Sequence, residues 1–279
     1  GALVGLYNYG TGDTAAGDPA YVEQVVVTSP DGARRYEVAG FTTAIAWCDS
    51  GMYSVAEAGE PLLDIARQHG AQQYDIPPTW SDILSRVYPP GDPLVGQFRS
   101  VLPDGRQGYA QWAICRDETI LTVTSGQAEA TRLVIWPTDG TPPSAVPLVG
   151  LAGEPLNLDP YIASQSRIMD WAPDKRELVW FGGDGKLRSS NLDTGQTSTL
   201  WDSEIDWNRS ANNTVTFQGS TLYLFTVQGE PSANPTMRFW AHNLDSEQTT
   251  DILTVNLHAK SVDRALEQRG FAIRPTHDT

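Results

Sequence analysis

The feature that most constrains the fold of this chain is a repeated pattern of short, strand-like segments. Each copy has a strand that ends near an aromatic residue, then a polar turn, an apolar strand, a further strand and a closing strand after an Asp/Gly-rich turn. The aromatic residues that mark the copies lie roughly 45–65 residues apart: Trp47, Trp112, Trp171 and Phe217. Units of four strands that recur every roughly 40–50 residues are typical of β-propeller blades, and wider spacings indicate insertions in loops.

Four internal blades follow from this pattern. They cover residues 43–76, 109–140, 168–201 and 214–255. In the first of them, the third and fourth strands are expected at 61–67 and 71–76.

The N-terminal residues supply three more strands of a blade, at 3–9, 21–29 and 33–38, and residues 270–274 are the natural candidate for its missing first strand. We therefore predict an all-β fold. A single propeller domain covers residues 1–279, with five blades of four antiparallel strands, and its N- and C-terminal strands share one blade. Six blades would require further strands within the long insertion.

That insertion covers residues 76–98 and contains five prolines. Thr79 can cap a helix, and Asp82 follows three residues later as the acidic partner of the cap. The sequence therefore predicts a Pro-rich helical insertion, with a short helix at 80–87. A second short helix is expected at 262–268, between Ser261 as its N-cap and Gly270 beyond its end.

The charge of the chain limits its partners. There are 19 Lys and Arg residues against 34 Asp and Glu residues, a net charge of −15. Such a surface repels phosphates, which argues against nucleic acids and against docking onto anionic lipid. The chain opens in strand-like sequence with no leader pattern, so we expect a mature extracytoplasmic domain: secreted, periplasmic, or an ectodomain whose membrane tether has been lost from the N-terminus.

The two cysteines, Cys48 and Cys115, each follow a tryptophan by an odd number of residues. Both side chains would therefore point to the same face of equivalent strands. If those strands are neighbours, the two Cα atoms could come within the roughly 7 Å that a disulfide requires. Two alternatives stay open: one disulfide, which would indicate an oxidising compartment, or two buried thiols.

One copy carries a recognisable motif. The segment Trp171-Ala172-Pro173-Asp174, followed by a polar turn and the apolar run 178–181, resembles the TolB-type (PD40-like) propeller repeat. The resemblance implies a propeller architecture and no particular activity.

Three carboxylates are candidates for general acid and base catalysis, because some five-bladed propellers are glycosidases. Asp170 lies within a predicted innermost strand, and Asp49 and Glu118 follow such strands. The alternative is that all three are turn residues, three of 34 acids in the chain. The four histidines have no metal-ligand spacing, so we expect no metal and no cofactor.

The tryptophans divide into two groups. Trp47, Trp112 and Trp171 recur at one position of the blade, so we expect them to be packing residues. Trp80 and Trp207 lie in irregular sequence and are better placed to contact a partner. The expected partner-binding residues lie in the insertion or in such irregular sequence: Trp80, Ile83, Arg86, Tyr88 and Trp207.

The sequence favours a non-enzymatic extracytoplasmic protein that binds a protein or a cell-envelope component through its loop face. The alternative is a carbohydrate-active propeller, either a glycoside hydrolase or a lectin, that uses the carboxylates Asp49, Glu118 and Asp170.

Overall fold

The structure, a computed structural model, describes residues 3–13, 19–30, 32–38, 41–58, 81–89, 94–99, 112–125, 130–159, 162–163, 166–169, 174–205, 210–228 and 235–257. Apart from two helical residues at 162–163, their regular elements are strands, and these form one three-stranded and four four-stranded antiparallel sheets. The all-β prediction is confirmed.

Within every sheet the strands lie side by side in the order of the sequence. The first sheet contains β1 (Leu3–Asp13), β2 (Pro19–Ser29) and β3 (Gly32–Val38). The second contains β4 (Phe41–Cys48), β5 (Gly51–Ala58), β6 (Ser81–Tyr88) and β7 (Leu94–Arg99). The third contains β8 (Ala113–Arg116), β9 (Thr119–Thr124), β10 (Arg132–Pro137) and β11 (Ser144–Pro147). The fourth contains β12 (Arg167–Ile168), β13 (Glu177–Phe181), β14 (Lys186–Asn191) and β15 (Thr197–Asp202). The fifth contains β16 (Ser210–Gln218), β17 (Thr221–Gln228), β18 (Thr236–Asn243) and β19 (Gln248–Asn256).

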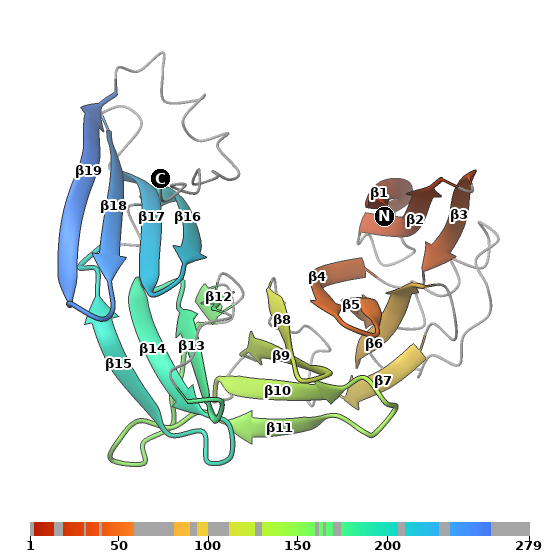
Figure 1. Cartoon of the computed structure of the whole chain (residues 1–279), viewed down its shortest axis with the longest axis horizontal. Coiled ribbons are helices and arrows are strands. Elements are labelled where there is room, and N and C mark those ends of the chain that lie inside the picture. Colours follow the sequence, from red (N-terminus) through yellow and green to blue (C-terminus); the bar gives the residue numbers. More distant parts are fainter. Residues whose placement is uncertain are drawn as a thin grey trace.

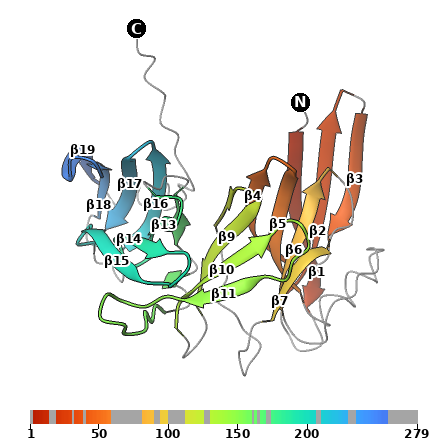
Figure 2. The same ribbon diagram turned by 60° about the horizontal axis from the view of Figure 1, so that its bottom comes forward.

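The sheets follow one another along an arc (Figure 1). The first strand of each four-stranded sheet lies on the concave side of this arc, and the last strand lies on the convex side. A four-stranded antiparallel meander arranged in this way is the topology of a propeller blade. The first and fifth sheets lie at the two ends of the arc in both views (Figures 1 and 2). Residues 270–274 lie outside the described part, so the shared blade, and with it five-bladed closure, stays a prediction.

Apolar clusters join each sheet to the next. Each cluster can be identified by two of its buried members: Val25 and Met52 for the first and second sheets, Leu84 and Trp136 for the second and third, Leu133 and Trp180 for the third and fourth, and Phe181 and Trp240 for the fourth and fifth. The core therefore lies between stacked sheets, because alternate side chains of each strand point to opposite faces.

The expected helix at 80–87 is wrong. Residues Ser81–Tyr88 form β6, where Leu84 pairs with Val55 of β5 and with Gly96 of β7. The cap signal of Thr79 and Asp82 is local, whereas strand pairing and burial between two sheets favour the extended backbone. The strands expected at 61–67 and 71–76, and the helix expected at 262–268, fall outside the described residues. In the second sheet, β6 and β7 occupy the third and fourth strand positions.

A disulfide joins the second and third sheets. Cys48 at the end of β4 is bonded to Cys115 of β8, with their Cα atoms 5.4 Å apart. The disulfide alternative is confirmed. The bond links the first strands of two consecutive sheets, so it fixes one sheet to the next on the concave side of the arc.

Candidate binding site on the concave side

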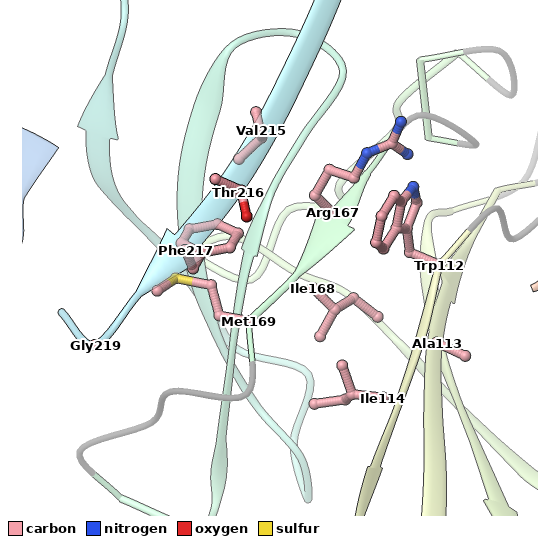
Figure 3. Close-up of a pocket in the computed structure, with 10 residues that line it drawn as sticks. All are labelled: Trp112, Ala113, Ile114, Arg167, Ile168, Met169, Val215, Thr216, Phe217 and Gly219. Atoms are coloured by element: carbon pink, nitrogen blue, oxygen red, sulfur yellow. The ribbon is translucent and has the colours of Figure 1, made fainter. Parts of the chain in front are cut away.

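A cavity of about 510 Å³ lies between the first strands of the third, fourth and fifth sheets. Its lining comes from β8 and the residue before it, from β12 and the residue after it, and from β16 and its following turn (Figure 3). These residues are Trp112, Ala113, Ile114, Arg167, Ile168, Met169, Val215, Thr216, Phe217 and Gly219. Three segments that are far apart in the sequence therefore build one site.

The floor of this cavity is apolar and belongs to the core. Ile168 is buried in the cluster between the third and fourth sheets, and Met169 in the cluster between the fourth and fifth. Phe217 packs against the second of these clusters from β16. Because core packing holds these side chains in place, the shape of the cavity is fixed by the stacking of the sheets.

The charged group of the site is Arg167. Its guanidinium lies over the indole ring of Trp112, 4.3 Å from the ring centroid, in a cation–π contact (Figure 3). Burial lowers the pKa of Arg167 to about 10, so the side chain still carries its charge at neutral pH. Its Nη1 atom is buried without a hydrogen-bond partner.

The structure corrects the expected role of the repeated tryptophans. Trp47 is 58% exposed and Trp112 is 44% exposed, so neither is a packing residue. In β4 the small residues Ala44 and Ala46 are buried, whereas Ile45 and Trp47, which alternate with them, are exposed. Trp47 therefore lies on the open face of β4, next to its end, whereas Trp112 directly precedes β8. Trp171 falls outside the described residues.

Two of the three candidate catalytic carboxylates lie in neighbouring turns. Asp49 is exposed in the turn after β4, and Glu118 lies in the turn after β8. Glu118 accepts hydrogen bonds from the hydroxyl of Ser50, from the backbone N–H of Ser50 at 3.0 Å and from the hydroxyl of Thr138 at 3.0 Å. These bonds, the Ser50 hydroxyl first, lower the pKa of Glu118. The carboxylate therefore stays ionised and connects two sheets, an arrangement that does not suit a general acid.

Asp170 lies outside the described residues, so the catalytic set stays a prediction. Among the residues that the structure describes, no three His, Cys, Asp or Glu side chains are grouped to hold a metal ion.

The expected partner-binding residues that the structure describes lie in a strand and not in an exposed loop. Ile83 lies within β6 and is 2% exposed, so its side chain offers no surface to a partner, and this expectation is wrong. Arg86 and Tyr88 are half-buried in the same strand, and the ring of Tyr88 lies 6.4 Å from that of Trp47. Trp80 and Trp207 fall outside the described residues.

The importance of Arg167 was missed in reading the sequence. It begins the clearest copy of the repeat as a lone cation directly before Ile168-Met169. A charged residue at the start of an apolar innermost strand is the signal that could have identified it.

The sequence matches no family model and no curated protein. Solved structures similar to the chain include TolB proteins and other β-propellers. The β-propeller domain of Cps50 (Swd1) from Myceliophteria thermophila is 11% identical, with a TM-score of 0.43, over 90% of this chain and 72% of that one. TolB from Acinetobacter baumannii is 12% identical, with a TM-score of 0.43, over 91% of this chain and 54% of that one. A putative TolB from Agrobacterium tumefaciens is 12% identical, with a TM-score of 0.41, over 91% of this chain and 70% of that one. Because these TM-scores are all below 0.5, we assign the fold from the strand order within the sheets of the chain itself.

Proposed function

We propose that the protein is a non-enzymatic, extracytoplasmic binding protein that holds a segment of a protein partner on its concave side. The observation that carries this proposal is the exposure of two large aromatic side chains: Trp112, which lines the apolar cavity just before β8, and Trp47 on β4, the first strand of the preceding sheet. Exposed aromatic groups on a rigid scaffold are typical of binding surfaces. We therefore place the contact surface on the concave side, and not at residues 76–98 as the sequence had suggested.

The size of the cavity suits part of a polypeptide segment. Its volume of about 510 Å³ falls within the range of roughly 300–1,000 Å³ for sites that enclose a small ligand. Such a cavity holds one or two side chains, and the exposed strands beside it can support the neighbouring residues of a peptide.

The compartment and the absence of catalysis are parts of the same proposal. The disulfide between Cys48 and Cys115 supports an oxidising compartment. The hydrogen bonds of Glu118 to Ser50 and Thr138 support a structural role for one of the three candidate catalytic carboxylates. No helix in the described part of the chain has the length and apolar character of a membrane span.

Selection from a library of random peptides displayed on phage tests this proposal. We expect enriched peptides to bind the wild-type protein, and Trp112→Ala to weaken them at least tenfold. The matched control is Leu200→Ala, which removes an exposed apolar side chain from β15 on the convex side. Peptides that bind the Trp112→Ala protein as well as the wild type would contradict the proposal.

A carbohydrate-binding function is the second candidate, because the exposed faces of Trp47 and Trp112 could also stack on sugar rings. An array of immobilised glycans probed with the same three proteins distinguishes the two functions. Glycan binding that depends on Trp112, together with no enriched peptide, would favour the carbohydrate function.

A further inference from the structure

Three arginines in the described part of the chain stack on tryptophan rings, and two of them are neutralised. Arg188 lies over Trp180 and is bonded to Asp184, with Nη1 to Oδ1 at 2.7 Å. Arg238 lies over Trp240 and is bonded to Asp251, with Nη2 to Oδ2 at 3.1 Å. In each case a carboxylate of the chain supplies the counter-charge to the stacked guanidinium.

Arg167 is the exception. Its guanidinium stacks on Trp112 in the same way, but none of the ion pairs among the described residues includes it, and its buried Nη1 has no hydrogen-bond partner. A partly buried cation without a counter-charge is destabilising. The chain has 34 acidic residues, yet none of the ion pairs in its described part gives Arg167 a carboxylate partner.

The remaining polar groups of the cavity complement an anion. The indole N–H of Trp112 and the hydroxyl of Thr216 can each donate a hydrogen bond, and neither carries a negative charge. Directly beside these donors the lining is apolar, with Ile168, Met169 and Phe217 (Figure 3).

We propose that this cavity binds the C-terminal residue of a protein partner, with the free carboxylate on Arg167 and an apolar side chain against Ile168, Met169 and Phe217. The inference rests on the proposed function and specifies the ligand of the same site. A C-terminal residue carries its carboxylate and its side chain on one Cα, which matches a cavity where a cation adjoins an apolar floor. A carboxylate paired with a guanidinium gains charge-assisted hydrogen bonds, and often two at once.

The test compares two pools of acetylated random octapeptides that end in Leu, one as free acids and one as C-terminal amides. Peptides retained by the protein are identified by mass spectrometry, and the best binder is titrated calorimetrically in both forms. We expect the acid to bind at least tenfold more tightly than the amide. We expect Arg167→Gln to bring this ratio close to one. The matched control, Arg238→Gln, removes an equivalent stacked arginine from β18 and should leave the ratio unchanged.

A third peptide, amidated and with Glu in place of the terminal Leu, separates the two sources of a carboxylate. If it binds as tightly as the free acid, the site recognises an acidic side chain and the C-terminal inference is wrong. Equal binding of acid and amide by the wild-type protein also overturns the inference. The proposed function fails separately, when binding does not depend on Trp112.

Thermal unfolding distinguishes this binding role from a structural one. Arg167→Met removes an unpaired cation, so we expect the melting temperature of the free protein to rise while the preference for the acid is lost. A fall in melting temperature, with the acid preference retained, would show that Arg167 serves the fold and would contradict the proposal.

Discussion

At the scale of single residues, Asp82 gives the sharpest prediction about stability. It lies in β6 and is 8% exposed, and burial raises its pKa to about 7 from an ordinary value of 3.8. Between about pH 4 and pH 7 the folded protein keeps this proton, whereas the unfolded chain has lost it. The contribution of Asp82 to the free energy of unfolding is therefore full below about pH 4, falls as the pH rises to about 7, and stays low above that.

Asp82→Asn should remove this part of the pH dependence. A pKa shift of one unit corresponds to about 1.4 kcal/mol, so we expect the variant to gain more than about 1 kcal/mol relative to the wild type between pH 4 and pH 8. Urea unfolding at both pH values measures the difference, with Asp193→Asn in an exposed turn as the control. An identical pH slope in wild type and Asp82→Asn would contradict the prediction.

Individual side chains are also where sequence reasoning was least successful. Trp47 lies next to the end of β4, whereas Trp112 directly precedes β8, so the two do not occupy the same position of the blade. The period of a strand also does not say which of its two faces meets a neighbouring sheet. That choice depends on how the sheets stack. The same limit applies to Arg167, whose contact with Trp112 joins segments of different sheets.

At the scale of elements, the disulfide between Cys48 of β4 and Cys115 of β8 holds the second and third sheets together. The disulfide closes a loop across a sequence separation of 67 residues. In the chain-entropy model, such a loop contributes about 4 kcal/mol to the free energy of unfolding. We expect the Cys48→Ser, Cys115→Ser double variant to lose roughly this amount in urea unfolding. A loss below about 1 kcal/mol would mean that the disulfide contributes little to stability and would contradict the prediction.

The turns beside that disulfide form a second connection. Glu118→Gln replaces a carboxylate that accepts bonds from Ser50 and Thr138, and we expect a loss of about 1–2 kcal/mol. The pKa of Glu118 is lowered on folding, so its contribution is present above the unfolded pKa and is lost as the pH falls through the folded pKa. A double-mutant cycle with Ser50→Ala should show a favourable coupling, and strictly additive losses would argue against the bond.

The strands themselves were largely predictable. In the third, fourth and fifth sheets the strands follow the expected pattern, because alternation and tight turns are local signals. The Asp193-Thr194-Gly195 turn is an example, since Gly195 adopts a φ of 71° that favours glycine. The second sheet was mispredicted after β5, because proline-rich sequence beside a cap signal predicted a helix where β6 pairs with β5 and β7.

At the scale of the whole molecule, the remaining prediction is that a C-terminal strand completes the three-stranded first sheet and so closes the propeller. If residues 270–274 complete this sheet, a truncated chain that ends at residue 257 should lose amide protection in β1 and β2. Protection in β13 and β14 of the fourth sheet should be unchanged. Hydrogen–deuterium exchange measures both regions in one experiment. Unchanged protection of the first sheet would contradict the shared blade.

The repeated four-strand pattern is enough to predict consecutive four-stranded sheets, and Figure 1 shows these sheets along an arc. The binding site could not be predicted in the same way. Trp112, Arg167 and Phe217 come from three different sheets, and their meeting depends on the angle between sheets. No local pattern specifies that angle.

Photo-crosslinking of the best peptide from the display selection tests the central claim, that the concave side is the binding surface. Benzoylphenylalanine in place of Phe217 in the cavity should crosslink to the peptide, and in place of Leu253 on the outer strand β19 it should not. An excess of unlabelled peptide should abolish the crosslink. Crosslinking from Leu253 with none from Phe217 would place the binding surface elsewhere and contradict the account.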